Sequence, residues 1–274
     1  MMTTNNEVVV ITGATSGIGL ELTHLMAKSA PLCLIGRSKE KLEKLTLLLS
    51  EKYPGPFYYI VKDLSKENAA YEVFTTFKEK GLTPSILYNN AGIGDYEYFL
   101  DSDITKQQSI INVNIKALME LCYYFGNEMK KKQKGVIVNV ASIGAYTPGP
   151  LMATYYASKA FVLSFSLAIS EEFKKENVIV KVVSPGPTNT AFFEKANSNC
   201  DMMAHIKSSD PSLVAKAIFD FTFKKGTTLV VGFKNKLGVL GLRFITLKKA
   251  SKIVMNIQKK RISVSYTHLR AHET

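Results

Sequence analysis

Short apolar runs alternate along this chain with stretches of helical length, and this alternation constrains the fold more than any other feature. The runs are four to six residues long and lie at Val8–Thr12, Leu32–Gly36, Phe57–Val61, Ile86–Asn89, Val136–Val140, Val178–Val183 and Thr228–Val231. Strands that are apolar on both faces are typical of a parallel sheet covered by helices on both sides. The stretches between them predict helices that include Gly17–Lys28, Lys39–Lys52, Ile104–Lys131 and Thr154–Lys175. The chain is therefore expected to form a doubly wound α/β fold with seven parallel strands and with its functional loops at their carboxyl ends.

The positive charge of the chain is concentrated near its C-terminus. The net charge is +12, but residues 1–220 contain 23 Lys/Arg against 22 Asp/Glu, whereas residues 221–272 contain 12 Lys/Arg and no acidic residue. No helix-turn-helix, zinc-finger or RNA-binding signature accompanies this basic segment. We therefore expect no nucleic-acid partner.

The cysteines and the start of the chain bear on its cellular setting. Cys33, Cys122 and Cys200 are odd in number and far apart, so they predict neither a disulfide framework nor a metal site. The first expected strand begins too early to leave room for a signal peptide, and no run of about 18 apolar residues is present. These features favour a reduced, cytoplasmic setting.

A glycine-rich turn follows the first expected strand and is a candidate phosphate-binding site. It reads Thr12-Gly13-Ala14-Thr15-Ser16-Gly17-Ile18-Gly19 and leads into a Leu-rich stretch. Glycine allows a sharp turn and a close approach of a pyrophosphate, and a helix N-terminus offers free N–H groups and a favourable dipole. Such turns also occur for steric reasons alone, so the strand before it and the helix after it are what favour nucleotide binding.

The spacing of these glycines, Gly-x-x-x-Gly-x-Gly, resembles the cofactor turn of the short-chain dehydrogenase/reductase family. Further motifs of that family follow in order: Asp63-Leu64, Asn89-Asn90-Ala91-Gly92, Asn114, Ser142, Tyr155-x-x-x-Lys159 and Pro185-Gly186-Pro187-Thr188-Asn189-Thr190. The resemblance covers about residues 7–232. It implies a Rossmann-type fold, a nicotinamide cofactor, oxidoreduction between a carbonyl and an alcohol, and a homodimer or homotetramer formed through the two longest helices.

Tyr155 and Lys159 form the candidate acid–base pair. They are four residues apart on an expected helix and so share one face. A phenol has a pKa of about 10, and a nearby ammonium stabilises the phenolate and lowers that pKa. Tyr156 is a rival by residue type, but its neighbour four residues on is Ala160. We therefore expect Tyr155 to carry the reacting proton.

Two further residues complete the expected catalytic set. Ser142 ends the fifth expected strand, thirteen residues before Tyr155, where its hydroxyl can hydrogen-bond a carbonyl on which charge develops. By resemblance, Asn114 holds a water that links Lys159 to solvent. Asn112 competes with it, and Ala117 stands where the family pattern Asn-x-x-Gly has glycine.

The end of the second expected strand bears on the choice of cofactor. An acidic residue there would bind the ribose 2′-hydroxyl of NAD, whereas a 2′-phosphate needs a cation. The chain has Gly36-Arg37-Ser38 at this point and no acid, which favours NADP(H), although Arg37 can also be a solvated start to the next helix. The complete expected cofactor set is Gly13, Thr15, Ser16, Gly17, Ile18, Gly19, Arg37, Ser38, Asp63, Leu64, Asn90, Ala91, Gly92, Tyr155, Lys159, Pro185, Gly186, Thr188 and Thr190. Asp63 can in addition cap a helix that begins near Ser65.

The chain is expected to divide into three parts. Residues 1–233 form the catalytic domain, and within them residues 187–210 contain Phe192, Phe193, Met202 and Met203 without a clear period, as in a substrate lid that suits an apolar ligand. Residues 234–261 form a basic amphipathic extension, which either docks on the domain and helps to close the substrate pocket or contacts an anionic membrane surface. Residues 262–274 lose all pattern and resemble translated sequencing-adaptor read-through, so we expect them to be non-native.

Together these features predict an NADP(H)-dependent oxidoreductase that reduces a ketone or 3-oxoacyl carbonyl, with no metal. The alternative is an NADP(H)-binding regulator of the same fold without turnover. An intact Tyr155, Lys159, Ser142 and Asn114 set favours the enzyme, because a regulator does not need these residues.

Overall fold

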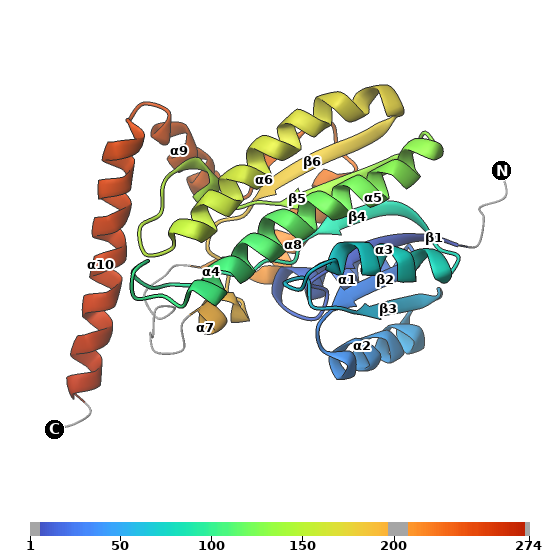
Figure 1. Cartoon of the computed structure of the whole chain (residues 1–274), viewed down its shortest axis with the longest axis horizontal. Helices are drawn as coiled ribbons and strands as arrows, with labels where there is room; N and C mark the ends of the chain where they lie inside the picture. The colour runs from blue at the N-terminus through green and yellow to red at the C-terminus, as the bar shows by residue number, and fades with distance from the viewer. Residues whose placement is uncertain (1–5, 197–207, 272–274) are drawn as a thin grey trace.

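The computed structural model describes residues 6–196 and 208–271, leaving out the side chains of residues 193–195 and 260–271. Its seven strands form one parallel sheet in the order β3-β2-β1-β4-β5-β6-β7. The strands are β1 (Glu7–Thr12), β2 (Leu32–Gly36), β3 (Phe57–Val61), β4 (Thr83–Asn89), β5 (Gly135–Val140), β6 (Val178–Ser184) and β7 (Thr228–Val230). The direction of winding reverses between β1 and β4, and ligands bind at such a reversal. The predicted doubly wound, seven-stranded fold is confirmed (Figure 1).

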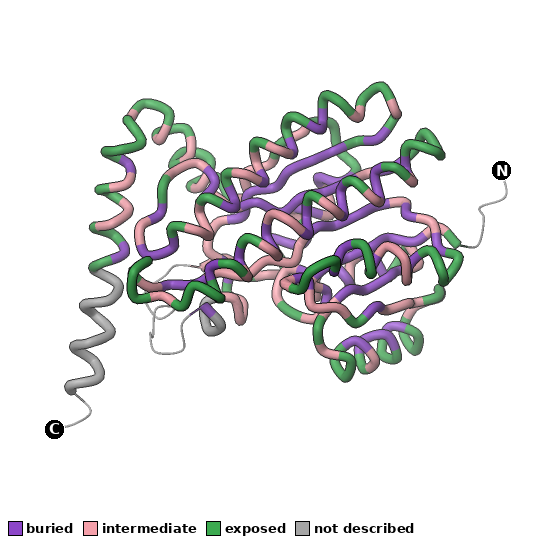
Figure 2. Tube along the Cα trace, in the orientation of Figure 1, coloured by how far each residue is buried: buried purple, intermediate pink, exposed green. Residues whose placement is uncertain are grey.

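Helices cover both faces of the sheet. Residues of α1 (Gly17–Ala27), α2 (Lys39–Lys52) and α8 (Pro211–Thr222) pack with one face in a single hydrophobic cluster. Residues of α3 (Ala69–Glu79), α5 (Leu118–Lys131) and α6 (Ala153–Glu172) pack with the other face. Figure 2 shows the result: the central strands are buried along most of their length, the edge strands β3 and β7 are only partly buried, and the helices are buried on the side that meets the sheet.

Three helices lie beyond the carboxyl ends of the strands, at the left of Figure 1. They are α7 (Ala191–Ala196), α9 (Phe233–Leu242) and α10 (Leu247–Ala271). The helix α10 continues past residue 261, where the sequence loses its pattern, so no end of an element marks the expected boundary of the tail. Cys200, Met202 and Met203 lie outside the described residues, as does the middle of the expected lid, residues 197–207.

Strand β4 begins three residues before its expected start. Pro84, which lacks an N–H group, argues against a central strand at this point. The neighbouring strand β5 pairs with β4 only from Ile86 onward, so Thr83 and Pro84 have a partner on the β1 side alone. Proline is tolerated on such an edge, and the pairing of β1 with β4 shifts register between Val8 and Val9 to pass it.

The expected long helix Ile104–Lys131 has the predicted ends but is not uniform. It consists of α4 (Ile104–Ile111), a π-helical turn at Asn112–Ala117 and α5. Asp103 caps its start, because its carboxylate accepts a hydrogen bond from the Thr105 N–H at 2.8 Å. π-Helical turns are rare and occur most often at functional sites.

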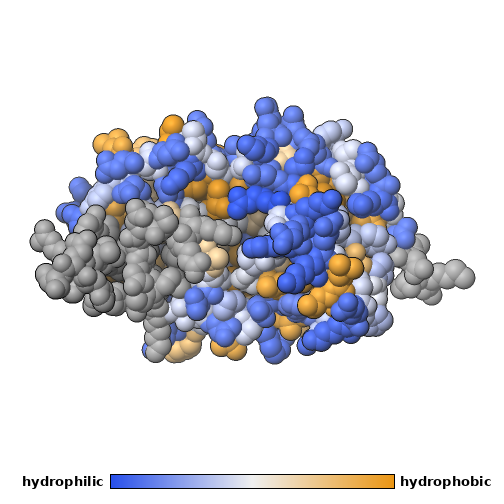
Figure 3. Space-filling model, turned by 90° about the horizontal axis from the view of Figure 1, so that it is seen from below, coloured by the Kyte–Doolittle hydropathy of each residue, from blue (hydrophilic) through white to orange (hydrophobic). Residues whose placement is uncertain are grey.

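The two described cysteines are structural. Cys33 and Cys122 are buried free thiols, and burial raises the pKa of each to about 12. They are therefore protonated and unreactive near neutral pH. In the described ranges, no group of His, Cys, Asp and Glu side chains has the arrangement of a metal site, and no helix is long and apolar enough to cross a bilayer. The face in Figure 3 is mostly hydrophilic, with hydrophobic residues in small groups.

Candidate active site

A cavity of about 650 Å³ lies at the carboxyl ends of the strands and brings most of the predicted site together. Its walls come from the loops after β1 to β6, from α6 and from α9 and α10. All the predicted site residues line it except Gly19 and Asn114, which lie behind its wall. Residues far apart in the sequence therefore share one cavity.

The glycine-rich turn after β1 is held by the loop after β4. The Thr12 hydroxyl accepts the backbone N–H groups of Asn90 and Ala91 at 3.0 and 2.9 Å, and the Asn90 amide donates to the Thr12 carbonyl at 3.1 Å. Gly13 has a φ of +66°, which favours glycine. A Cβ at Gly19 would lie only 2.2 Å from the Gly13 carbonyl oxygen, so Gly19 allows the turn to close without itself reaching the cavity.

The end of the cavity beside β2 is positively charged. Arg37, Lys41 and Lys62 line it, and Lys62 is paired with Glu72. The Ser38 hydroxyl accepts the Lys41 N–H at 3.3 Å and caps α2, which sets that helix N-terminus against the cavity. A phosphate group would meet cations and free N–H groups here.

Asp63 is the one acidic residue among those lining the cavity in the described chain. Partial burial acts to raise its pKa, but hydrogen bonds from the Ser65 N–H and hydroxyl and the charges of Arg37 and Lys66 hold the pKa below its usual value. The expected helix cap at this position is wrong. Asp63 closes a turn instead, and α3 begins only at Ala69, because Asn68 adopts a left-handed conformation with φ +55° that no helix continues through.

Tyr155 and Ser142 meet in the centre of the cavity. Burial raises the pKa of Tyr155 to about 12, a hydrogen bond with Ser142 opposes this rise, and the charge of Tyr156 adds to it. Ser142 also caps a short 3₁₀ turn, where its hydroxyl accepts the Gly144 N–H at 3.1 Å. The neighbouring Tyr156 packs its ring over Gly149, where a Cβ would lie 2.1 Å from the ring.

Lys159 does not lower the pKa of Tyr155 in this structure, contrary to the expectation from their spacing. The Lys159 ammonium is 5.8 Å from the centre of the Tyr155 ring and donates to the Val140 carbonyl at 2.8 Å. Burial is also the cause of the shift at Lys159, where it lowers the pKa of the ammonium to about 8.

Asn114 is fully buried in the π-helical turn. Its Oδ1 accepts the Ile93 N–H at 2.9 Å, and its Nδ2 donates to the Ile93 carbonyl at 2.9 Å and the Ser158 hydroxyl at 3.0 Å. Both N–H donors of the Asn114 side chain are therefore occupied, which leaves its main-chain groups and the second lone pair of Oδ1 to bind the expected water. This role of Asn114 stays a prediction. The rival Asn112 turns away and donates to the Ser65 carbonyl.

Gly92 separates Asn114 from Lys159. A Cβ added at Gly92 would lie 3.3 Å from the Lys159 Nζ and 3.5 Å from the Asn114 Oδ1. The absence of a side chain here therefore lets the lysine, the asparagine and the loop after β4 come close together.

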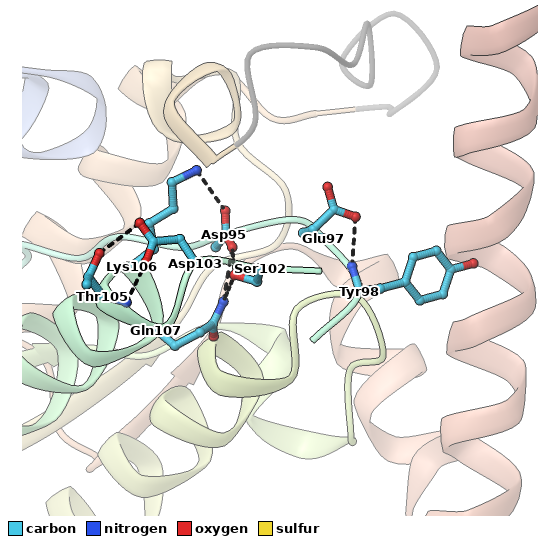
Figure 4. A network of polar contacts seen from close by, with 8 residues as sticks. All are labelled: Asp95, Glu97, Tyr98, Ser102, Asp103, Thr105, Lys106 and Gln107. Atoms are coloured by element: carbon cyan, nitrogen blue, oxygen red, sulfur yellow. Dashed lines mark hydrogen bonds and ion pairs between the residues drawn. The ribbon is translucent and has the colours of Figure 1, made fainter. Parts of the chain in front are cut away.

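The loop after β4 is anchored by a buried carboxylate. Asp95 is 5% exposed, and its Oδ2 accepts the Ser102 hydroxyl at 2.5 Å and the Gln107 Nε2 at 3.0 Å, while Lys106 approaches its Oδ1 at 3.8 Å (Figure 4). Further along the same loop, the Tyr98 side chain points toward α10. Asp95 thus ties the loop to α4.

The substrate end of the cavity is apolar. Phe192 of α7 packs on Tyr155 with ring centres 5.1 Å apart, and it lines the cavity together with Met152 and Tyr156. Side chains of α9 and α10 complete this wall: Val239, Leu242, Ile253, Val254 and Ile257. The C-terminal extension therefore docks at the cavity. The side chain of Phe193, also expected in the lid, lies outside the described residues.

Comparison with known proteins identifies the family. The family model described as short chain dehydrogenase matches residues 7–201 of this chain. The chain belongs to the short-chain dehydrogenase/reductase family. The resemblance deduced from the glycine-rich turn and the Tyr155-x-x-x-Lys159 motif is thereby confirmed.

Similar members of the short-chain dehydrogenase/reductase family include two curated enzymes. Human (Homo sapiens) 17-beta-hydroxysteroid dehydrogenase type 3 is 35% identical over 196 residues, which cover 69% of this chain and 62% of that protein. Very-long-chain 3-oxoacyl-CoA reductase of Anas platyrhynchos is 38% identical over 181 residues, which cover 64% of this chain and 58% of that protein. The match thus spans about three-fifths of the length of these relatives.

Solved structures give a similar result. A short-chain dehydrogenase from Sphingobium yanoikuyae in complex with NADPH superimposes with a TM-score of 0.78 at 25% identity and covers 86% of this chain and 93% of that one. A structure described as a 7beta-hydroxysteroid dehydrogenase superimposes with a TM-score of 0.80 at 24% identity, covering 90% and 96%, which supports the fold alone.

Several cavity residues escaped the sequence analysis. Lys41 lies in the first turn of α2 and Met152 directly before α6, and their closeness in the sequence to Arg37 and Tyr155 is the signal that could have indicated them. Gln258 is buried and lines the cavity from α10, which only the packing of that helix reveals.

Proposed function

We propose that this protein is an NADP(H)-dependent oxidoreductase that reduces an apolar ketone or 3-oxoacyl group to an alcohol. The observation that carries the proposal is the single cavity lined by Ser142, Tyr155 and Lys159, with Arg37 at its far end. A regulator that only binds the cofactor has no need of the catalytic group. Membership of a family of dehydrogenases supports the same activity.

The residues at the first strand fit a dinucleotide. A Cβ at Gly17 would lie 2.6 Å from Thr190 across the cavity, so glycine keeps the N-terminus of α1 open to a pyrophosphate. Arg37, Ser38 and Lys41 suit a 2′-phosphate, and no acidic residue stands at the end of β2 to repel it. NADP(H) is therefore the proposed cofactor. When bound, it supplies or accepts the hydride.

The state of Tyr155 favours reduction. Burial raises its pKa to about 12, so the phenol is protonated at neutral pH and can donate its proton to a carbonyl oxygen. Ser142, hydrogen-bonded to Tyr155, can donate to the same oxygen as charge develops there. Oxidation of an alcohol would need the phenolate and should therefore increase with pH, whereas reduction should not.

The walls of the cavity support an apolar substrate. Phe192, Met152 and five apolar side chains of α9 and α10 line this end, whereas these two helices contribute three polar residues to the lining, Lys234, Asn235 and Gln258. The relatives named for a hydroxysteroid and for a very-long-chain 3-oxoacyl thioester are consistent with such a substrate. We propose a bulky or long-chain carbonyl compound rather than a sugar.

The proposal is tested by following NADPH absorbance with a ring ketone, a long-chain 3-oxoacyl thioester and a sugar ketone. We expect turnover of an apolar compound and a loss of about 10²-fold or more in kcat with Tyr155→Phe, while NADPH still binds. Binding of NADPH without turnover of any compound, and without an effect of Tyr155→Phe, would instead support the regulator.

We also propose that the protein is a homo-oligomer. Large apolar residues are exposed along the outer faces of α4 and α5, namely Ile104, Ile111, Met119 and Tyr123. A second copy would cover them. Light scattering after size exclusion tests this, and a monomer at micromolar concentration would contradict it.

A further inference from the structure

Helix α9 carries its most exposed apolar residues on the side that faces away from the cavity. None of its residues is buried, and Phe233, Leu237 and Leu240 are 74%, 53% and 50% exposed. The turn that follows exposes Phe244 by 82%, and α10 begins with Leu247, 65% exposed. We call these five residues the α9 ridge. Figure 2 shows the exposure of this region at the end of the molecule where α9 lies in Figure 1.

The three ridge residues on α9 share one face of that helix. Phe233, Leu237 and Leu240 follow one another at intervals of four and three residues, which places them on one face of the helix. No atom lies within 4 Å of a Cβ added at Gly241, which follows Leu240 directly and does not line the cavity, so this part of α9 meets no other element in the described chain. An exposed apolar surface of this kind marks an interaction site.

The positive charge around the ridge favours an anionic partner. Residues 234–261 contain nine Lys/Arg and no Asp or Glu, and Lys236, Arg243, Lys248 and Lys249 are exposed beside the ridge. In the part of the chain that is described, none of the cations from 234 to 259 forms an ion pair. A second copy of this surface would bring like charges together, whereas an anionic lipid surface offers both apolar chains and phosphate groups.

We propose that the α9 ridge inserts into the surface of an anionic membrane and that its flanking cations contact the lipid phosphates. The protein then lies on the membrane without crossing it. Apolar residues between basic ones on a short helix are the pattern of an interfacial helix, in which the apolar face reaches the boundary between headgroups and acyl chains.

The ridge and the cavity lie on opposite sides of the same helix. Val239 and Leu242 of α9 line the cavity, as do Ile253 and Ile257 of α10, which are also about half exposed at its mouth. Insertion of the ridge would hold α9, whose inner side lines the cavity, at the membrane surface. An apolar substrate that leaves the bilayer would then have a short path to the cavity, a consequence that rests on the proposed function.

The membrane contact is tested with the full chain and vesicles of phosphatidylcholine, with or without phosphatidylserine. We expect sedimentation with the anionic vesicles that weakens as salt rises. The variant Leu240→Asp/Phe244→Asp should bind these vesicles at least about tenfold more weakly, because each change removes an apolar side chain that the bilayer would bury. Neither residue lines the cavity, so turnover of a water-soluble ketone should not change.

A matched control places the same two changes elsewhere. Leu47 and Phe223 are 66% and 63% exposed on α2 and after α8. The variant Leu47→Asp/Phe223→Asp should bind vesicles as the wild type does, and circular dichroism checks that both double variants fold.

Charge is tested separately with Lys248→Glu/Lys249→Glu, which should abolish the preference for phosphatidylserine. The proposal is overturned if the wild type binds neither vesicle, if it binds both equally, or if the ridge variant binds like the wild type. It is also overturned if the ridge variant merely dissociates an oligomer, because the ridge would then be a contact between copies. These measurements need no substrate, so they stand even if the proposed activity fails.

Discussion

Replacement of the buried lysine by an apolar residue should stabilise the protein while it removes activity. Lys159 is 4% exposed, and burial lowers its pKa from 10.5 to about 8. Keeping the ammonium charged at pH 7 therefore costs about 3 kcal/mol, at about 1.4 kcal/mol for each pKa unit. Lys159→Met removes this cost and keeps the volume of the side chain nearly constant.

The gain is reduced by one hydrogen bond. The Lys159 ammonium donates to the Val140 carbonyl, and its loss costs about 1–2 kcal/mol. The net gain at pH 7 is thus about 1–2 kcal/mol. Because the pKa is lower in the folded state, the unfolded chain binds more protons between pH 8 and 10.5, and the wild type gains stability as pH rises through this range. The advantage of the variant should therefore shrink and then reverse by about pH 10.5.

Urea unfolding of the cofactor-free proteins at several pH values measures the pH at which wild type and variant become equally stable. Differences between wild type and Lys159→Met at each pH remove the contributions of other groups, including Tyr155, whose raised pKa lowers stability in both proteins above pH 10. The exposed Lys249→Met serves as control and should follow the wild type. A variant that is less stable at pH 7, with a difference that does not change with pH, would refute the reasoning.

Three further changes test the rest of the site. Arg37→Ala should raise KM for NADPH by about 10- to 100-fold, the loss of a charge-assisted hydrogen bond, and leave KM for NADH nearly unchanged in steady-state assays. Gly19→Ala should lower the free energy of unfolding by about 3 kcal/mol or more in urea titrations, because its Cβ would lie 2.2 Å from the Gly13 carbonyl oxygen. The control Gly241→Ala, where no atom lies within 4 Å of the added Cβ, should raise the free energy of unfolding by about 0.5–1 kcal/mol. Asp95→Asn should lower stability by about 1–3 kcal/mol and raise KM for the carbonyl substrate more than KM for NADPH; equal effects on both would show that the loop after β4 does not act on the substrate end.

The fold could be predicted because its strands are apolar on both faces and separated by helical stretches. The bounds of β2, β3 and α2 agree with the prediction to the residue. The start of β4 could not be predicted, because Pro84 is tolerated there only for want of a neighbour in β5, which is a property of the sheet. The π-helical turn at Asn114 likewise has no local sequence signal.

The membership of the site was predicted better than its energetics. The order of the motifs along the chain predicted that Ser142, Tyr155 and Lys159 belong to one site, and all three line the cavity. The expectation that the lysine lowers the tyrosine pKa came from helical spacing alone. Desolvation depends on what covers each group, and Phe192 of α7, which packs on Tyr155, is far away from it in the sequence. The C-terminal helices were recognised as amphipathic, but which apolar residues face the cavity could not be deduced.

The loop after β4 is anchored at several points along its length. Asn90 bonds to the glycine-rich turn, Ile93 to Asn114, Gly94 packs under Phe192, and the Tyr96 hydroxyl donates to the Gln258 carbonyl of α10 at 3.1 Å. Four separate elements thus meet seven consecutive residues. Insertion of one residue there would displace the cofactor turn, the π-helical turn or the C-terminal helix, whichever anchor gave way. Changes of substrate preference at this loop, in evolution or by design, should therefore occur by substitution rather than by insertion or deletion.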